Sequence, residues 1–170
     1  MNDLGGNSGS KPFKLRRADL ADLEAVNGLI EAAVMGWALP ERVKRLSLAS
    51  YRYDKHDLSF LELAVAETAY PGPIGVAAWE PADSADVPDG GAALLLHGLY
   101  VAPDRQRKGV GTCLFEMAEQ AAIRKRLDGV LVKAQVDAAG FFRGLGLEQL
   151  PVRNPERDYP HRYWRPLCHP

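Results

Sequence analysis

Residues 94–112, which read LLLHGLYVAPDRQRKGVGT, constrain the fold more than any other part of the chain. The first part of this stretch is almost continuously apolar and ends at a Pro–Asp pair, which predicts a buried strand over about 93–102 and then a turn. Gly98 inside the strand is typical of a bulge or of a close backbone approach. Apolar residues at helical spacing follow, so an amphipathic helix should begin near Thr112.

The turn between this strand and helix combines positive charge with the amides of a helix start. Arg105, Arg107 and Lys108 lie in it, and Gly109 and Gly111 leave the backbone open to a ligand. Unpaired amides and the helix dipole both favour an anion at this point. The turn is therefore a candidate phosphate site, although a solvated basic loop accounts for its composition equally well. Neither the G-x-G-x-x-G dinucleotide pattern nor the P-loop pattern fits its spacing.

Length and composition predict one domain, residues 12–167, after a flexible tail of residues 1–11. The chain has 170 residues, of which 46% are hydrophobic and 25% charged, and its net charge is −1. Such a balance gives no overall field to attract nucleic acid or an anionic membrane, so neither partner is expected. Two cysteines and four scattered histidines provide no disulfide framework and no metal site. Without an apolar leader or anchor, a cytoplasmic location is expected.

The other elements follow from apolar periodicity and turn residues. A helix should begin at Asp19 and end before Trp37. An irregular aromatic loop is expected at 47–59. The strand at 130–134 is strongly apolar and should lie parallel to the central strand, because the helix between them can act as a right-handed crossover. The remaining predicted strands are 13–16, 61–67, 74–79 and 161–166, and the remaining predicted helices are 41–46 and 138–145.

Two sequence blocks resemble those of the GNAT superfamily of acyl-CoA N-acyltransferases. The Q-x-x-G-x-G turn at 106–111, preceded by LYVAP, is similar to the family's pyrophosphate-binding turn. Residues 135–147, QVDAAGFFRGLGL, are similar to its second block, N-x-x-A-x-x-F-Y with a leucine-glycine ending. Gln135 stands where asparagine is usual and Phe142 where tyrosine is usual. The resemblance covers nearly all of 12–167 and implies an α/β (α+β) fold. Its sheet would be mixed and mostly antiparallel, splayed into a V between two parallel central strands, with helices on both faces.

The resemblance implies an N-acetyltransferase. A primary amine of a small molecule or peptide would attack bound acetyl-CoA directly in a ternary complex, with acetyl-CoA as co-substrate and no metal. The enzyme would be a monomer or a homodimer. The alternative is a CoA-binding sensor or regulatory module with little or no turnover. Phe142 favours that alternative, because phenylalanine cannot supply the hydroxyl that usually protonates the departing thiolate.

The resemblance also suggests which residues act. A main-chain amide within 99–101, centred on Tyr100, would polarise the thioester carbonyl. His97 is the candidate base, at the place of a proton-handling histidine in arylalkylamine N-acetyltransferase; a core-facing histidine is the alternative. The expected acyl-CoA contacts are Leu99, Tyr100, Val101, Gln106, Arg107, Lys108, Gly109, Val110, Gly111, Thr112, Gln135, Ala138 and Phe142.

The acceptor amine should be cationic or aromatic, because several rings could surround it. For any single ring, packing in the core is the alternative interpretation. The candidate rings are Trp37, Tyr51, Tyr53, His56, Tyr159 and His161.

Overall fold

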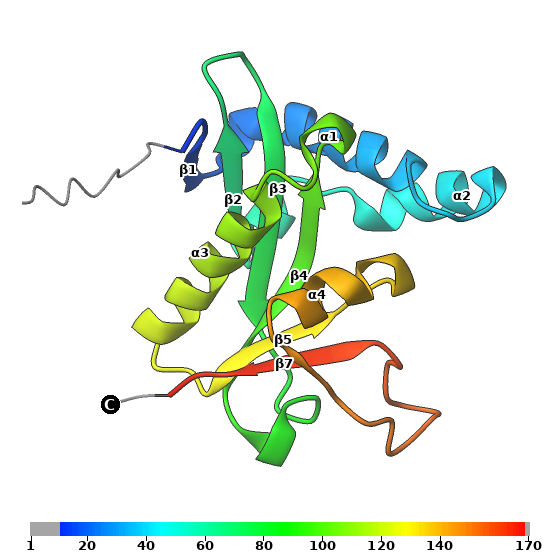
Figure 1. Cartoon of the computed structure of the whole chain (residues 1–170), viewed down its shortest axis with the longest axis vertical. Coiled ribbons are helices and arrows are strands. Elements are labelled where there is room, and N and C mark those ends of the chain that lie inside the picture. Colours follow the sequence, from blue (N-terminus) through cyan, green and yellow to red (C-terminus); the bar gives the residue numbers. More distant parts are fainter. Residues whose placement is uncertain (1–10, 169–170) are drawn as a thin grey trace, which may run out of the picture.

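The computed structural model describes residues 11–168, and seven strands of this part form one mixed sheet in the order β1-β2-β3-β4-β5-β7-β6 (Figure 1). β4 and β5 are parallel, whereas the other neighbouring pairs are antiparallel. The strands are β1 (Lys14–Arg17), β2 (Glu62–Glu67), β3 (Pro73–Pro81), β4 (Ala93–Val101), β5 (Gly129–Lys133), β6 (Glu148–Gln149) and β7 (Arg162–Pro166). The predicted tail of residues 1–11 lies, apart from Lys11, outside the described residues.

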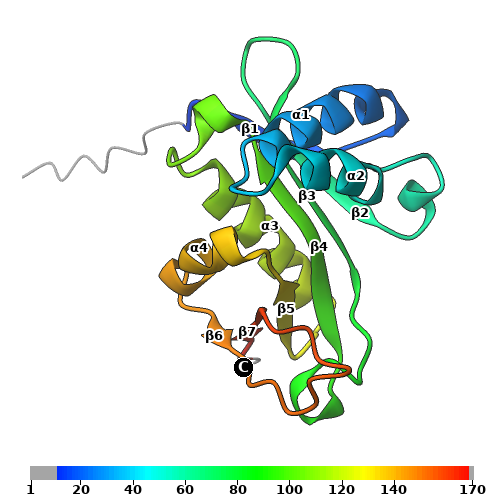
Figure 2. The same ribbon diagram turned by 90° about the vertical axis from the view of Figure 1, so that its right-hand side faces the viewer.

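Helices cover both faces of the sheet (Figure 2). α3 (Val110–Arg124) and α4 (Ala139–Gly144) cover one face, and α1 (Leu23–Met35) covers the other, with α2 (Glu41–Tyr51) beside α1. Each face has its own apolar core, and each large apolar side chain buried there contributes about 1.5–3 kcal/mol. The core under α3 includes Leu94, Leu114, Phe115 and Tyr163, whereas that under α1 includes Val26, Ile30, Val76 and Tyr100.

The sheet opens between its two parallel strands. β4 pairs with β5 only from Ala93 to Leu96, opposite Gly129–Val132. Beyond Leu96, β4 continues along β3 to Val101, while β5 and β7 turn away from it (Figure 1). This confirms the predicted V between two parallel central strands, and both strands lie within a residue of their predicted bounds.

A bulge in β4 lies at the point where the sheet opens. Gly98 pairs with Ala78 and Leu96 pairs with Trp79, so His97 is an extra residue opposite β3. A bulge of this kind turns two successive side-chain positions to one face of the sheet. Gly98 must lack a side chain, because a Cβ atom there would collide with the Tyr53 hydroxyl and with the Tyr100 ring.

The segment after α1 differs from the prediction. A helix over 41–46 followed by an irregular loop was expected, whereas α2 continues to Tyr51 and a short 3-10 turn follows at Asp57–Ser59. The Ser47 hydroxyl donates to the Val43 carbonyl oxygen (2.8 Å), and the Ser50 hydroxyl donates to that of Ser47 (2.6 Å). These serines therefore satisfy their hydrogen bonds within the helix instead of ending it.

α3 and β6 also differ from the prediction, whereas the predicted capping arrangement is present. α3 begins at Val110, two residues before its predicted start, and the two-residue strand β6 was not predicted. At the start of the first helical segment, Asp19 and Asp22 form a reciprocal capping box, as their spacing predicts. Among the described residues, no helix is long and apolar enough to cross a membrane.

Candidate active site

The turn that leads into α3 presents unpaired amides. Gly109 occupies the N-cap with a φ of 81°, in the left-handed region that favours glycine. The first hydrogen bond of the helix runs from the Cys113 amide to the Gly109 carbonyl oxygen (3.1 Å), so the amides of 110–112 precede it. Gly109 has no side chain with which to cap them. These amides and the helix dipole are suited to hold an anion.

The polar side chains of the turn are partly engaged with its own backbone. Lys108 Nζ donates to the Asp104 carbonyl oxygen (3.0 Å), and Gln106 Nε2 donates to that of Val101 (3.4 Å). The exposed Arg107 has a φ of 60°, also in the left-handed region. The amides thus form the fixed part of this candidate anion site, and the basic side chains lie around it.

The main chain of β4 faces the opening at alternate residues. The Ala102 amide donates to the Ile74 carbonyl oxygen (2.9 Å), so Ala102 and Tyr100 direct their main-chain groups toward β3. Leu99 and Val101 therefore direct theirs away from β3, toward the side that β5 has left. Tyr100 was expected to be central to the polarising segment, but its own amide faces Val76 of β3. The amides of Leu99 and Val101 are the ones that reach the opening.

Aromatic rings from three parts of the chain meet beside the opening. Trp37 packs edge-on against Tyr51, with ring centroids 5.3 Å apart, and stacks on Tyr100 at 6.4 Å. The Tyr51 hydroxyl accepts a hydrogen bond from Gln135 Nε2 (3.0 Å), which links α2 to the segment after β5. Burial raises the pKa of Tyr51, and the nearby Tyr159 adds to this. Four residues expected to bind ligands, Trp37, Tyr51, Gln135 and Tyr159, thus lie together with Tyr100.

Other candidate acceptor residues lie elsewhere or are buried. Only 4% of Tyr53 is exposed, so its ring cannot stack on an acceptor. Its hydroxyl instead lies 3.2 Å from His97 Nδ1, and His97 itself is exposed. His56 packs edge-on against Phe60, and the His161 carbonyl oxygen accepts a hydrogen bond from the Ala134 amide while its ring lies beside Tyr159.

The two neighbouring phenylalanines of α4 have different environments. Phe142, expected to contact the cofactor, is 4% exposed and packs between Phe115 and Tyr163, with centroids 6.3 and 6.1 Å away. Phe141 is 37% exposed, and its Cζ would lie 3.2 Å from a Cβ atom at Gly111. Phe141 is thus the ring beside the turn that leads into α3. Neighbouring helical residues point about 100° apart, and the sequence carries no signal of which phenylalanine is buried.

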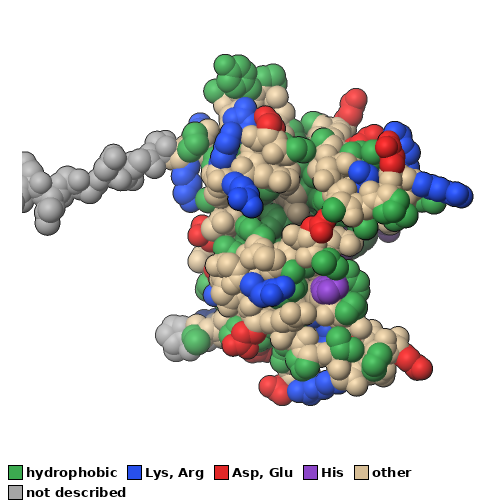
Figure 3. All heavy atoms as spheres, turned by 45° about the vertical axis from the view of Figure 1, so that its right-hand side comes forward, with side chains coloured by type: hydrophobic (Ala, Val, Ile, Leu, Met, Phe, Trp, Pro, Cys, Tyr) green, Lys and Arg blue, Asp and Glu red, His purple; other side chains and the backbone are tan. Residues whose placement is uncertain are grey.

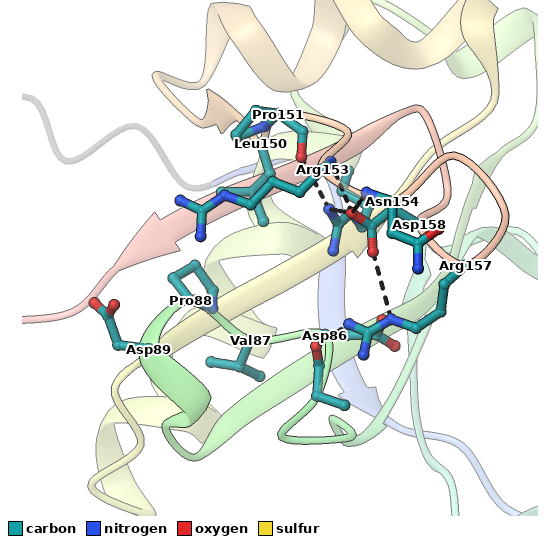
Figure 4. Close-up of a pocket in the computed structure, with 12 residues that line it drawn as sticks. Asp86, Val87, Pro88, Asp89, Leu150, Pro151, Arg153, Asn154, Arg157 and Asp158 are labelled. Carbon is teal, nitrogen blue, oxygen red and sulfur yellow. Dashed lines mark hydrogen bonds and ion pairs between the residues drawn. The ribbon is translucent and has the colours of Figure 1, made fainter.

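A separate depression of about 380 Å³ lies where the loops at 85–89 and 150–158 meet (Figure 4). Asp158 accepts hydrogen bonds from the Arg153 and Asn154 amides, which hold its pKa below the ordinary value, and it pairs with the buried Arg162 at 3.2 Å. Arg157 also faces Asp158 (Figure 4). These pairs hold the 150–162 segment together, and Arg157 Nη2 also donates to the Ala85 carbonyl oxygen (2.5 Å), which joins the two loops.

Metal-ligating side chains are dispersed over the described residues. On the face shown in Figure 3, basic and acidic side chains occur in small mixed groups. The described part of the chain contains no cluster of three or more His, Cys, Asp or Glu side chains placed to share a metal ion.

Comparisons with solved structures identify the same fold. A GNAT-family acetyltransferase from Staphylococcus aureus is 10% identical, with a TM-score of 0.67 and coverage of 92% of this chain and 99% of that one. An N-acetyltransferase, PaiA, from Thermoplasma acidophilum, in complex with coenzyme A, is 14% identical (TM-score 0.67; 89% and 96% covered). A GNAT-family acetyltransferase from Brucella melitensis, in complex with acetyl-CoA, is 17% identical (TM-score 0.60; 92% and 97% covered).

The sequence comparisons are of two kinds. No curated protein matches the sequence significantly. The family model described as the acetyltransferase (GNAT) domain matches residues 59–149, which include the bulge, the basic turn and α4. More than half of the chain is matched, and the chain therefore belongs to the GNAT family of acetyltransferases.

Proposed function

We propose that this acetyltransferase moves an acetyl group from acetyl-CoA to a primary amine of a small molecule or peptide, by direct attack in a ternary complex. The observation that carries the proposal is the opening between β4 and β5, with unpaired amides at one end and His97 beside it. An opening of this kind can hold two reactants together, which removes much of the entropic barrier to their reaction.

The residues of the opening fit acyl-CoA. The amides of 110–112 would bind the pyrophosphate, with Gln106, Arg107 and Lys108 around it. The pantetheine arm would lie along the main chain of β4, where Leu99 and Val101 carry groups not paired with β3. One of these two amides would donate to the thioester carbonyl and stabilise the negative charge that develops on it.

His97 would take a proton from the acceptor amine. Histidine side chains titrate near neutral pH, and His97 is exposed on the bulge beside the opening. The rings of Trp37, Tyr51 and Tyr159 support an acceptor that is cationic or aromatic. Another structure with this fold contains AtaT with acetyl-methionyl-tRNA, so a charged tRNA belongs among the acceptors to be tested.

A CoA-binding sensor with little turnover is the second candidate, and the absence of a hydroxyl at Phe142 favours it. One experiment separates the two functions. Release of the CoA thiol from acetyl-CoA is measured with small amines, peptides with a free N-terminus, and aminoacyl-tRNA, against a control without acceptor. Release that depends on an amine supports the transferase, whereas tight binding of acetyl-CoA with no release for any acceptor supports the sensor.

A further inference from the structure

We propose that Tyr53 is a positioning residue for His97, whose imidazole it holds at Nδ1 so that Nε2 is presented to the acceptor amine. The inference rests on the proposed function, because it names the group that orients the proposed base. It replaces the interpretation of Tyr53 as a ring that stacks on the acceptor.

The buried side chain of Tyr53 contacts the exposed side chain of His97. The Tyr53 hydroxyl lies 3.2 Å from His97 Nδ1, with ring centroids 5.7 Å apart. Tyr53 is anchored to α1 by both main-chain groups, because its amide donates to Asn27 Oδ1 (2.9 Å) and its carbonyl oxygen accepts from Asn27 Nδ2 (2.8 Å). An exposed histidine would otherwise sample several rotamers, and the hydroxyl favours one of them.

The bulge and the glycine after it make this contact possible. Leu96 and Leu99 pack in the core under α3, whereas Tyr100 packs in the core under α1. Since Gly98 also faces Tyr53 and Tyr100, the bulge brings His97 and Gly98 to the α1 face side by side. The Tyr53 hydroxyl occupies the space that a side chain at 98 would need. Glycine at position 98, next to His97, therefore leaves room for the Tyr53 hydroxyl.

The positions of the protons on the His97 ring are consistent with this arrangement. In the neutral tautomer that can act as a base, the Nδ1–H group donates to the Tyr53 oxygen and Nε2 carries the free electron pair. When the acceptor ammonium gives up its proton, one N–H bond breaks on the amine and one forms at Nε2. The Nδ1–H···O bond remains in the resulting imidazolium.

Tyr53 keeps its own proton throughout. Burial raises the pKa of Tyr53 well above its usual range, and the neighbouring Tyr100, Asp57 and Glu80 add to this. The phenol oxygen is therefore a neutral hydrogen-bond partner and not a second base. Its role is to fix the orientation of the His97 ring, and it can accept the Nδ1–H bond of the tautomer that leaves Nε2 free.

The substitution Tyr53→Phe tests the proposal, because it keeps the ring and removes the hydroxyl. We expect kcat to fall about tenfold, a part of the usual effect of a positioned base. The KM for acetyl-CoA should not change, because the substitution leaves the proposed CoA-binding groups in place. Tyr163→Phe is the matched control, since it removes a buried hydroxyl from the other face of the sheet. An unchanged kcat in Tyr53→Phe would overturn the proposal.

A double-mutant cycle separates positioning from a general structural effect. In a His97→Ala background, Tyr53→Phe should cause no further loss of kcat, because the group that it orients is already gone. If Tyr53→Phe lowers kcat by the same factor in both backgrounds, Tyr53 acts on something other than His97 and the proposal is wrong.

Nitrogen NMR of the His97 ring supplies a readout that needs no turnover. We expect the proton of the neutral ring on Nδ1 in the unchanged protein, and a shift of the tautomer population in Tyr53→Phe. A proton on Nε2 in both proteins, with acetyl transfer intact, would overturn the role of Tyr53 and leave the proposed function standing. An Nδ1 proton with no transfer to any amine would support the contact but refute the proposed function, and with it any catalytic role for Tyr53.

Discussion

Gly98→Ala should destabilise the protein and slow its reaction, although it adds only one methyl group. The nearest atom to that methyl would be the Tyr53 hydroxyl oxygen, followed by Cε2 of the Tyr100 ring. Tyr53 and Tyr100 are only 4% and 9% exposed, so neither ring can turn out into solvent. Insertion of a methylene-sized group into such packing costs about 1–3 kcal/mol. The free energy of unfolding should fall by that amount, and the melting temperature by about 2–4 °C per kcal/mol.

The same substitution at Gly28 is the control. Gly28 lies inside α1, and an added Cβ atom there would have no neighbour within 4 Å. Gly28→Ala should therefore stabilise the protein by about 0.5–1 kcal/mol through helix propensity alone. Chemical denaturation of both variants, followed by circular dichroism, measures the two effects with opposite expected signs.

The double variant Gly98→Ala/Tyr53→Phe tests whether the Tyr53 hydroxyl causes the loss of stability in Gly98→Ala. Removal of the hydroxyl oxygen takes away the nearest atom, so Gly98→Ala should cost at least about 0.5 kcal/mol less in the Tyr53→Phe background. If Gly98→Ala is as stable as the unchanged protein, or if its cost is the same in both backgrounds, the bulge does not hold the Tyr53 hydroxyl as described.

Three further predictions concern other sites. Gly109→Val should weaken CoA binding, measured by calorimetry, more than Arg107→Ala does. The reason is that Gly109 has a φ of 81° and sets the direction of the amides that follow. An equal loss of affinity in the two variants would mean that the charge of the side chains dominates. Arg16 lowers the pKa of Asp22 through a hydrogen bond. This pair therefore stabilises the fold at pH values above the ordinary carboxyl pKa, and the stabilisation is lost as the pH falls. When the pH is lowered below about 4, the free energy of unfolding should accordingly fall less in Asp22→Asn than in the unchanged protein, as chemical denaturation would show. The Tyr163 hydroxyl is buried without a partner among the described residues, and thermal unfolding should show that Tyr163→Phe is more stable by about 1 kcal/mol.

Local sequence patterns were sufficient to predict the central part of the fold. The apolar run, the basic turn and the following helix each depend on residues close in sequence, and the parallel partner at β5 follows from the handedness of crossovers. The glycine inside β4 correctly indicated a bulge. The extent of α2 was missed, because Ser47 and Ser50 are found in loops as readily as inside helices, where they bond to carbonyl groups of the preceding turn.

Side-chain placement depends on tertiary packing, which the sequence pattern does not contain. Tyr51 and Tyr53 are two residues apart, yet Tyr51 lies beside Trp37 and Tyr53 is buried against Gly98. The pattern also cannot decide which of Phe141 and Phe142 faces the core. His97 could be assigned to the central strand, but its position as the extra residue of the bulge depends on the register between β3 and β4.

The most direct test of the proposed role of His97 is the steady-state rate of amine-dependent thiol release, compared across pH between the unchanged protein and His97→Ala. We expect His97→Ala to lower kcat about 100-fold, in the range typical of a lost general base. The KM for acetyl-CoA should be unchanged, and the acidic limb of the pH–rate profile should disappear. A His97→Ala variant that keeps the full kcat and the same pH profile would contradict the assignment of His97 as the base.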